Sequence, residues 1–115
     1  DTRIGDLTKI QSNAYITAYM TIEDRCFIAP CVQTTNDNFM GRTERRHQLI
    51  KGATIRKGAR VGGGVVLCPG IEIGQDAFIA AGAVVTKDVP ARKVLMGVPA
   101  RVVRDVAEDE LLDNQ

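Results

Sequence analysis

The chain has 115 residues, enough for one domain, and 44% of them are apolar while only 4% are aromatic. Its 15 Lys and Arg residues against 14 Asp and Glu leave a net charge of +1, far from the basic excess typical of non-specific nucleic-acid binding. No apolar stretch approaches the roughly 18 residues of a membrane span, and residues 1–6 do not form a signal peptide. We therefore expect a soluble protein without nucleic-acid or membrane partners.

Three cysteines, Cys26, Cys31 and Cys68, are odd in number and lack C-x-x-C spacing. This pattern argues against a disulfide framework and against a structural zinc site. We expect the cysteines to be small core or corner fillers in a protein of the reducing cytoplasm. Because the sequence begins at Asp1 without an initiator Met, we also expect a processed or N-terminally truncated chain.

Within residues 4–33 and again within residues 49–90, an aliphatic residue recurs at every sixth position. The five blocks over residues 4–33 each open with Ile, and the seven blocks over residues 49–90 open with Leu, Ile or Val. The fifth residue of nearly every block is small or apolar. Neither the helical period of 3.6 nor simple alternation produces this pattern, whereas a solenoid with three flat faces and one six-residue unit per face does.

In this solenoid each coil takes three blocks, the opening residue points inward, and the fifth residue packs near a corner. Five glycines lie around the predicted turns, where a positive φ or a close backbone approach is needed: Gly62, Gly64, Gly70, Gly74 and Gly82.

We expect one domain over residues 1–115, organised into four parts. N-terminal coils occupy residues 4–33, a loop occupies 34–48, further coils occupy 49–90, and a tail occupies 91–115. Within the tail, residues 96–103 are expected to form one extended segment and residues 105–113 a short helix. The tail would cap the open end of the solenoid, which otherwise exposes strand edges and core.

The repeat resembles that of the hexapeptide-repeat acyltransferase superfamily over nearly the whole chain. The resemblance implies an all-β fold, a left-handed parallel β-helix with a short C-terminal helix, whose crossovers depart from the usual right-handed rule. Members are typically homotrimers with active sites between neighbouring prisms, which implies a homotrimer here. Trimerisation would bury flat apolar faces of the thin solenoid.

The loop over residues 34–48 interrupts the count of six, and long loops in compact folds are commonly lids or binding loops. The alternative is a tolerated surface insertion. Its T-N-D element, followed by an aromatic residue, a turn and arginines, resembles the active-site loop of nucleotide-sugar N-acetyltransferases. That resemblance implies that Asn36 lies beside the sugar amine and that Asp37 is its neighbour in the acceptor pocket.

Three arginines follow in the same loop, Arg42, Arg45 and Arg46. Their guanidinium groups present paired donors that suit a diphosphate or a sugar carboxylate. The alternative is a solvated basic edge, or salt bridges to Glu44 and to a neighbouring chain.

His47 is the only histidine of the chain. In related O-acetyltransferases a loop histidine removes a proton from a sugar hydroxyl, whereas a neutral amine attacks a thioester unaided. His47 lies at the far end of the loop from Asn36, so we favour N-acetylation, with His47 as a secondary catalytic candidate or a partly exposed loop residue. A single histidine also excludes the β-helical carbonic anhydrases, and we predict no metal.

Residues 79–90 and 97–104 resemble the closing coils of acetyl-CoA-dependent members, which implies acetyl-CoA as the acyl donor. Five positions match residues that contact coenzyme A in those enzymes: Gly63, Ala81, Thr86, Lys87 and Arg104. Small residues let the extended pantetheine lie against the backbone, and Lys87 and Arg104 offer charge to the adenosine phosphates. For the glycine and alanine positions, the alternative is that they only satisfy the corners.

Together these features predict a cytoplasmic N-acetyltransferase that acetylates an amino sugar, nucleotide-linked, in cell-surface polysaccharide biosynthesis. The amine attacks the thioester directly, Asn36 orients the amine with Asp37 as the candidate proton acceptor, and a backbone N–H stabilises the oxyanion. One alternative is an O-acetyltransferase with His47 as base. The other is a noncatalytic β-helix scaffold.

Overall fold

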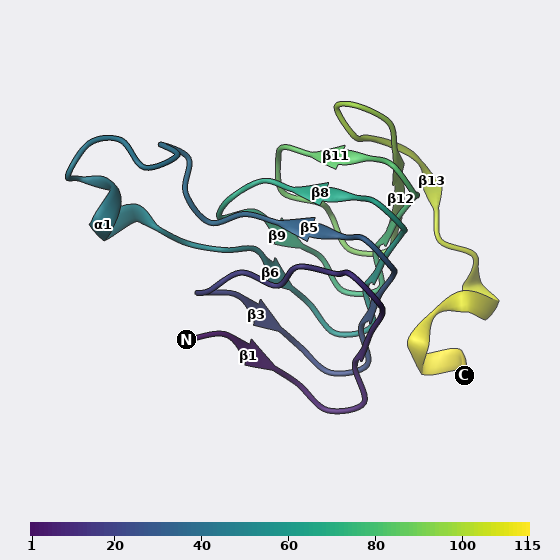
Figure 1. Ribbon diagram of the computed structural model, residues 1–115. Coiled ribbons are helices and arrows are strands. Elements are labelled where there is room, and N and C mark those ends of the chain that lie inside the picture. The colour runs from purple at the N-terminus through teal and green to yellow at the C-terminus, as the bar shows by residue number, and fades with distance from the viewer.

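The computed structural model describes all 115 residues and consists mainly of very short strands (Figure 1). Eleven strands have two residues each: β1 (Arg3–Ile4), β2 (Lys9–Ile10), β3 (Thr21–Ile22), β4 (Phe27–Ile28), β5 (Gln33–Thr34), β6 (Thr54–Ile55), β7 (Arg60–Val61), β8 (Val66–Leu67), β9 (Glu72–Ile73), β10 (Phe78–Ile79) and β11 (Val84–Val85). Two strands are longer, β12 (Lys93–Met96) and β13 (Arg101–Asp105). The helical segments are α1 (Arg46–Leu49) and the 3-10 turns η1 (Glu108–Glu110) and η2 (Leu112–Asn114). None of these helices has the length and apolar character needed to cross a membrane.

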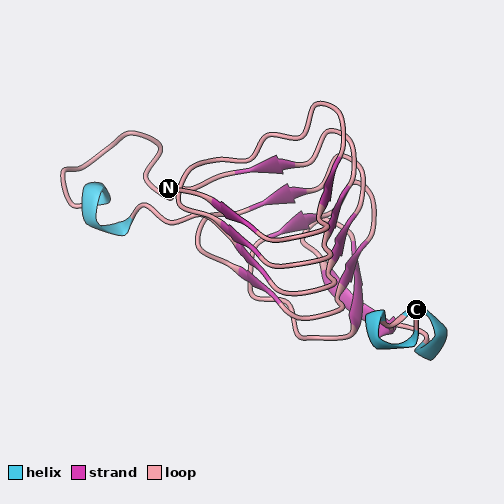
Figure 2. Cartoon of the chain, turned by 90° about the horizontal axis from the view of Figure 1, so that it is seen from below, coloured by secondary structure: helices cyan, strands magenta, loops and turns pink.

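The strands form three sheets in which neighbours pair in parallel, apart from the final β12–β13 pair. Sheet A contains β1, β3, β6 and β9, sheet B contains β2, β4, β7, β10, β12 and β13, and sheet C contains β5, β8 and β11. The chain visits A, B and C in turn, and partners such as Lys9 and Phe27 are three six-residue blocks apart. Figure 2 shows the strands stacked along the sides of the molecule. The parallel sheets expected from the repeat are confirmed.

The core consists of the opening and fifth residues of the blocks, as their spacing predicts. The openers Ile55 and Leu67 and the fifth residues Ala53 and Ala59 are all 0% exposed. Ile4 belongs to the same series but is 51% exposed, because β1 lies at the edge of sheet A and no strand covers it. An opener is therefore exposed where neither a coil nor the tail covers it, whereas Val85 on the edge strand β11 is buried beside the turn of the tail that bonds to Val84.

The corners place the fourth residue of ten of the twelve blocks in the left-handed region of backbone conformation. These residues include Leu7, Asn13, Tyr19, Arg25, Cys31, Gly58, Gly64, Gly70, Asp76 and Gly82. Gly62 has a different role, since a Cβ at this position would lie 2.6 Å from the Ala81 backbone nitrogen. Glycine is therefore used for a positive φ at the fourth position of a block and for a close backbone approach at Gly62.

Side chains on sheet A also join successive coils. Arg56 donates to Glu23 Oε2 at 3.1 Å and to Glu72 Oε1 at 2.7 Å, and these carboxylates lie on the strands or corners of the coils on either side. The hydrogen bond to Glu72 is the largest cause that raises the pKa of Arg56. The three side chains form a ladder across the parallel strands.

The tail differs from the expectation of one extended segment over residues 96–103 followed by a helix over 105–113. It forms an antiparallel hairpin of β12 and β13 with a turn at Gly97, whose φ is +96°. β12 pairs with β10, so this hairpin extends sheet B. Only the isolated turns η1 and η2 follow, and neither has a side-chain cap.

The end of the tail also lies elsewhere than expected, along the flank of the coil and not across its open end (Figure 1). The Leu112 backbone N–H donates to Asp76 Oδ1 at 3.0 Å, and Arg60 donates to Glu110 at 3.1 Å. Asp76 and Arg60 belong to the corner between sheets A and B and to sheet B itself. The last residues of the tail therefore cover a side wall, where their polar partners lie, whereas the hairpin turn covers the last coil through the bonds that join Gly97 and Ala100 to Val84.

The loop between β5 and β6 contains the helix α1, where the sequence predicts only irregular chain. Leu49, expected to open a coil, is the last residue of α1 and is 58% exposed. Burial resumes at Gly52 and Ala53. The interruption is thus a few residues longer at its C-terminal side than the six-residue count indicates.

Candidate functional site

The loop leaves the coil at the corner between sheets C and A, and side chains at its start bind both neighbouring coils. Asn36 Nδ2 donates to the Ala18 carbonyl at 3.2 Å, and Thr35 Oγ1 donates to the Leu67 carbonyl at 2.8 Å. The Lys51 backbone N–H donates to the Asn36 carbonyl at 2.9 Å, which joins the two ends of the loop. Asn36 is therefore held against the coil wall while the rest of the loop projects outward (Figure 1).

Asp37 organises the turn that follows Asn36. Its carboxylate accepts hydrogen bonds from the backbone N–H groups of Gly41 at 2.9 Å and Phe39 at 2.8 Å, and Arg46 lies 3.6 Å away. The bonds from Gly41 and Phe39 are the largest causes that lower the pKa of Asp37. A carboxylate stabilised in this way is a weak base.

Two of the three loop arginines contact other loop residues. Arg46 pairs with Asp37, and the Arg45 guanidinium lies 5.1 Å from the centre of the Phe39 ring, a cation–π contact. Arg42 is exposed and its side chain has no hydrogen-bond or ion-pair partner. Of the three predicted anion-binding residues, Arg42 is the one whose charge is free.

His47 lies on α1, in the part of the loop that projects from the coil. Its side chain is 56% exposed, and Nε2 is 3.6 Å from an oxygen of Glu44, which is 99% exposed. The structure therefore separates the two ends of the predicted catalytic set: Asn36 is fixed at the coil, and His47 stands in solvent on the helix.

The predicted donor residues lie at three different places. Gly63 and Ala81 stack at the corner between sheets B and C, where the Gly82 N–H donates to the Gly63 carbonyl at 2.9 Å. Thr86 and Lys87 stand at the corner between sheets C and A, in a cavity of about 290 Å³. Arg104 is exposed on β13 and donates to the carbonyl of Asp105.

Arg101 lines the cavity of Thr86 and Lys87, and the sequence analysis did not find it. Arg101 pairs with Met96 directly after the hairpin turn, whereas Arg104 lies beyond the shift in register between Val94 and Leu95. Arg101 and Arg104 both lie in the segment that resembles the closing coils. Only the folded hairpin shows that Arg101 lines this cavity and Arg104 does not.

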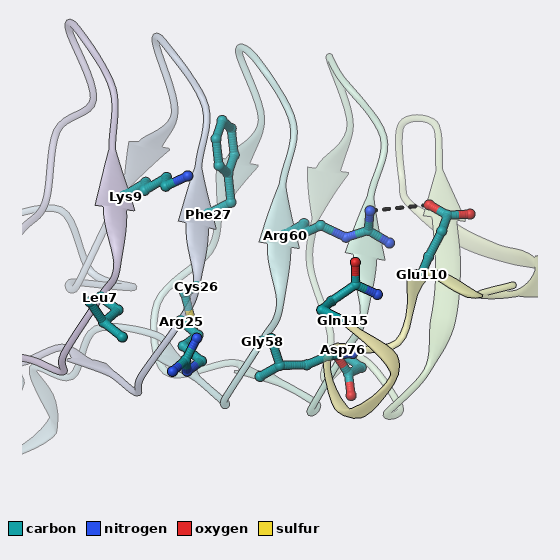
Figure 3. Close-up of a pocket in the computed structure, with 11 residues that line it drawn as sticks. Leu7, Lys9, Arg25, Cys26, Phe27, Gly58, Arg60, Asp76, Glu110 and Gln115 are labelled. Atoms are coloured by element: carbon teal, nitrogen blue, oxygen red, sulfur yellow. Dashed lines mark hydrogen bonds and ion pairs between the residues drawn. The ribbon is translucent and has the colours of Figure 1, made fainter. Parts of the chain in front are cut away.

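A larger cavity of about 340 Å³ lies between sheet B and the tail (Figure 3). Lys9, Phe27 and Arg60 line it from successive strands, and Arg25 lines it from a corner. Lys9 and Phe27 are one coil apart in the sequence, which is a visible signal, whereas Arg60 joins them only after the loop. The tail that closes the cavity carries no such signal.

No group of three or more His, Cys, Asp and Glu side chains is arranged to hold a metal ion. All three cysteines are free. Burial is the main cause that raises the pKa of the Cys26 thiol to about 11, so this thiol stays protonated and is a poor nucleophile.

Comparison with known proteins finds the same kind of repeat in a family of transferases. Residues 52–87 match the family described as bacterial transferase hexapeptide (six repeats). The solved structure of the hexapeptide-repeat-containing acetyltransferase VCA0836 of Vibrio cholerae O1 biovar eltor, complexed with acetyl coenzyme A, aligns with a TM-score of 0.74 at 32% identity and covers 93% of this chain and 61% of that one. The chain is thus similar in sequence and structure to hexapeptide-repeat transferases.

Two further similar proteins are named for different acceptor groups, one for O-acetylation and one for N-acetylation. The galactoside O-acetyltransferase of Escherichia coli K12 is 36% identical over 94 residues, which are 76% of this chain and 44% of that protein. A mutant GDP-perosamine N-acetyl transferase of Caulobacter crescentus, in complex with CoA and GDP-perosamine, aligns with a TM-score of 0.76 at 28% identity over 91% of this chain and 43% of that one. These proteins are acetyltransferases, the class expected from the sequence. The chain spans about half the length of the curated relatives that it matches.

Proposed function

We propose that this chain is part of an acetyl-CoA-dependent N-acetyltransferase that acetylates an amino sugar, with a nucleotide-linked sugar as the preferred acceptor. The observation that carries the proposal is the contrast between Asn36 and His47. Asn36 is fixed against the coil by its bond to Ala18, whereas the only histidine is exposed on α1. An amine acceptor needs a residue that orients it more than it needs a strong base.

In the proposed reaction the neutral amine nitrogen forms a bond to the thioester carbonyl carbon. The carbon–sulfur bond then breaks, the sulfur leaves as the coenzyme A thiolate, and the nitrogen loses a proton to solvent. Asn36 orients the amine, and a backbone N–H of the coil donates to the oxyanion. The lowered pKa of Asp37 makes it a poor proton acceptor. We therefore assign it the role of holding the loop turn and not that of taking the proton.

Bound acetyl-CoA supplies the thioester, and three places in this chain suit it. The exposed backbone at Gly63 and Ala81 leaves room for the extended pantetheine, while Lys87, Arg101 and Arg104 offer positive charge to phosphates. Thr86 lies beside Lys87 in the same cavity. For the acceptor, Arg42 is the free loop cation, and Arg45 and Arg46 would have to leave their present partners to bind an anion.

The loop and the Gly63–Ala81 pair occupy different corners of one coil. We infer a homotrimer of left-handed parallel β-helices in which the loop of one subunit meets the Gly63 corner of the next. Such an assembly would unite acceptor and donor residues and bury flat apolar faces. The proposed setting is the cytoplasm, in the synthesis of cell-surface polysaccharide.

An assay of coenzyme A release over a panel of amino-sugar nucleotides, free amino sugars and neutral sugars tests this proposal. We expect turnover on an amino-sugar nucleotide, a loss of roughly 10²-fold in kcat/KM for Asn36→Ala, and a change of less than about threefold for His47→Ala. Gln48→Ala, an exposed neighbour on α1, is the control for helix substitutions.

A second candidate is an O-acetyltransferase with His47 as the base. The observation in its favour is Glu44, whose carboxylate lies 3.6 Å from His47 Nε2 and would orient the imidazole. Turnover on a sugar hydroxyl that His47→Ala abolishes would establish this candidate. Failure of acetyl-CoA to bind in calorimetry, with the coil intact by circular dichroism, would instead support a noncatalytic scaffold.

A further inference from the structure

The cavity between sheet B and the tail is lined by none of the residues proposed for acetyl transfer. The loop emerges at the corner between sheets C and A, and sheet B is the wall opposite that corner. Figure 1 shows the loop and α1 on one side of the coil and the C-terminal tail on the other. A ligand in this cavity would therefore not touch Asn36 or the loop arginines of the same chain.

A row of alternating cations and aromatic rings runs across this wall. Lys9, Phe27 and Arg60 are the outward residues of β2, β4 and β7, and they pair in direct register, Lys9 with Phe27 and Phe27 with Arg60. Neighbouring parallel strands are about 4.8 Å apart, so the three side chains form one continuous surface. The Phe27 residue is 38% exposed, which leaves its ring open between two cations. Figure 3 shows the three side chains projecting from successive strands.

The charges around the cavity are only partly compensated. Arg60 is paired with Glu110 at 3.1 Å and lies over the Phe78 ring at 4.8 Å. Lys9 and Arg25 have no carboxylate partner within the chain. The remaining acidic lining residue, Asp76, is buried and accepts the Leu112 N–H. Two cations are thus free to bind an anion.

We propose that this cavity binds a nucleoside phosphate. The base would stack on Phe27, a contact that every base can make through its π-face. The phosphate would lie between Lys9 and Arg25. A volume of about 340 Å³ is within the range of small-ligand pockets. At the rim, the Gln115 amide nitrogen donates to two carbonyls of the tail, Asp109 and Leu111, which leaves its oxygen as an acceptor for a base edge.

Isothermal titration calorimetry on the full chain tests the site, with uridine diphosphate and adenosine 3′,5′-diphosphate as probes. The first probe carries a pyrimidine base with a diphosphate, and the second carries a purine base with two separate phosphates. We expect saturable binding of at least one probe, weakened about tenfold by Phe27→Leu, which keeps an apolar side chain but removes the ring. Lys9→Gln and Arg25→Gln should each weaken binding by several fold, and more at low salt.

Arg3→Gln is the matched control, because Arg3 is the outward residue of the equivalent strand on sheet A. It removes the same charge from the same coil and should leave binding unchanged. Binding of inorganic diphosphate as tight as that of both nucleotides would overturn the role of Phe27. Failure of both probes to bind, or equal weakening by Arg3→Gln and Lys9→Gln, would overturn the proposal, and circular dichroism of each variant separates these results from unfolding.

Discussion

The coil and the loop are stabilised in different ways. In the coil, residues at equivalent positions pair from one coil to the next. Openers such as Ile55 are completely buried between the strands on both sides. The loop has few contacts with the coil and depends on individual polar groups, chiefly Asn36 at its base and Asp37 at its turn. The comparison shows that the repeat provides stability while the interruption provides chemical variety.

The largest effect is expected from truncating an opener. Ile55→Ala removes a side chain that is 0% exposed and should lower the free energy of unfolding by about 2–5 kcal/mol, since a cavity remains between rigid strands. Ile4→Ala changes the same residue type at the same position of the repeat, but Ile4 is 51% exposed and should cost much less. Denaturant unfolding of both variants measures the difference, and equal losses would contradict a core filled coil by coil.

A smaller effect separates two adjacent glycines at one corner. Gly62→Ala would place a Cβ 2.6 Å from the Ala81 nitrogen and should destabilise the chain by about 1–3 kcal/mol. At Gly63 the nearest atom would be 3.6 Å away, an ordinary contact, so Gly63→Ala should fold with nearly unchanged stability. Thermal unfolding compares the two. If Gly63→Ala also weakens acetyl-CoA binding without loss of stability, Gly63 serves the donor and not the corner.

The smallest effect on overall stability is expected at Asp37. Its pKa is lower in the folded loop than its ordinary value of 3.8, so the loop gains stability from this carboxylate above that pH and loses it as pH falls through the folded pKa. We expect the amide protons of Phe39 and Gly41 to lose protection from exchange only below pH 3.8, while the amide protons of the coil stay protected.

In Asp37→Asn that acid transition should disappear, because no proton is taken up at this position. NMR hydrogen exchange on the variant provides the measurement. Loss of protection in the loop and in the coil at the same pH would contradict their separate stabilisation.

Much of this architecture could be predicted from spacing alone. The six-residue period locates the buried openers and the small fifth residues, because each must fit between the coils above and below it. It also predicts that a glycine is needed where a neighbouring backbone approaches closely, as at Gly62. The period predicts burial wrongly where it resumes after the loop: Leu49 fits the count of six but lies exposed at the end of α1.

The candidate site was less accessible to this reasoning. The composition of the loop points to Asn36, Asp37 and the arginines, but only the folded turn shows that Asp37 accepts two backbone N–H groups and that Arg45 lies on Phe39. Likewise, the last hairpin brings Arg101 to the cavity of Thr86 and Lys87. These contacts join residues without a common period.

By itself, the sequence determined the parallel sheets, the buried core and the place where the repeat is interrupted, because these depend on local spacing that every coil repeats. The tertiary structure decided where the tail packs and which outward side chains meet on sheet B. The tail binds Asp76 and Arg60, which precede it by many residues, and Phe27 faces Arg60 only because the chain re-enters the coil in register after the loop. Such contacts depend on how distant segments return to one another, which no local pattern specifies.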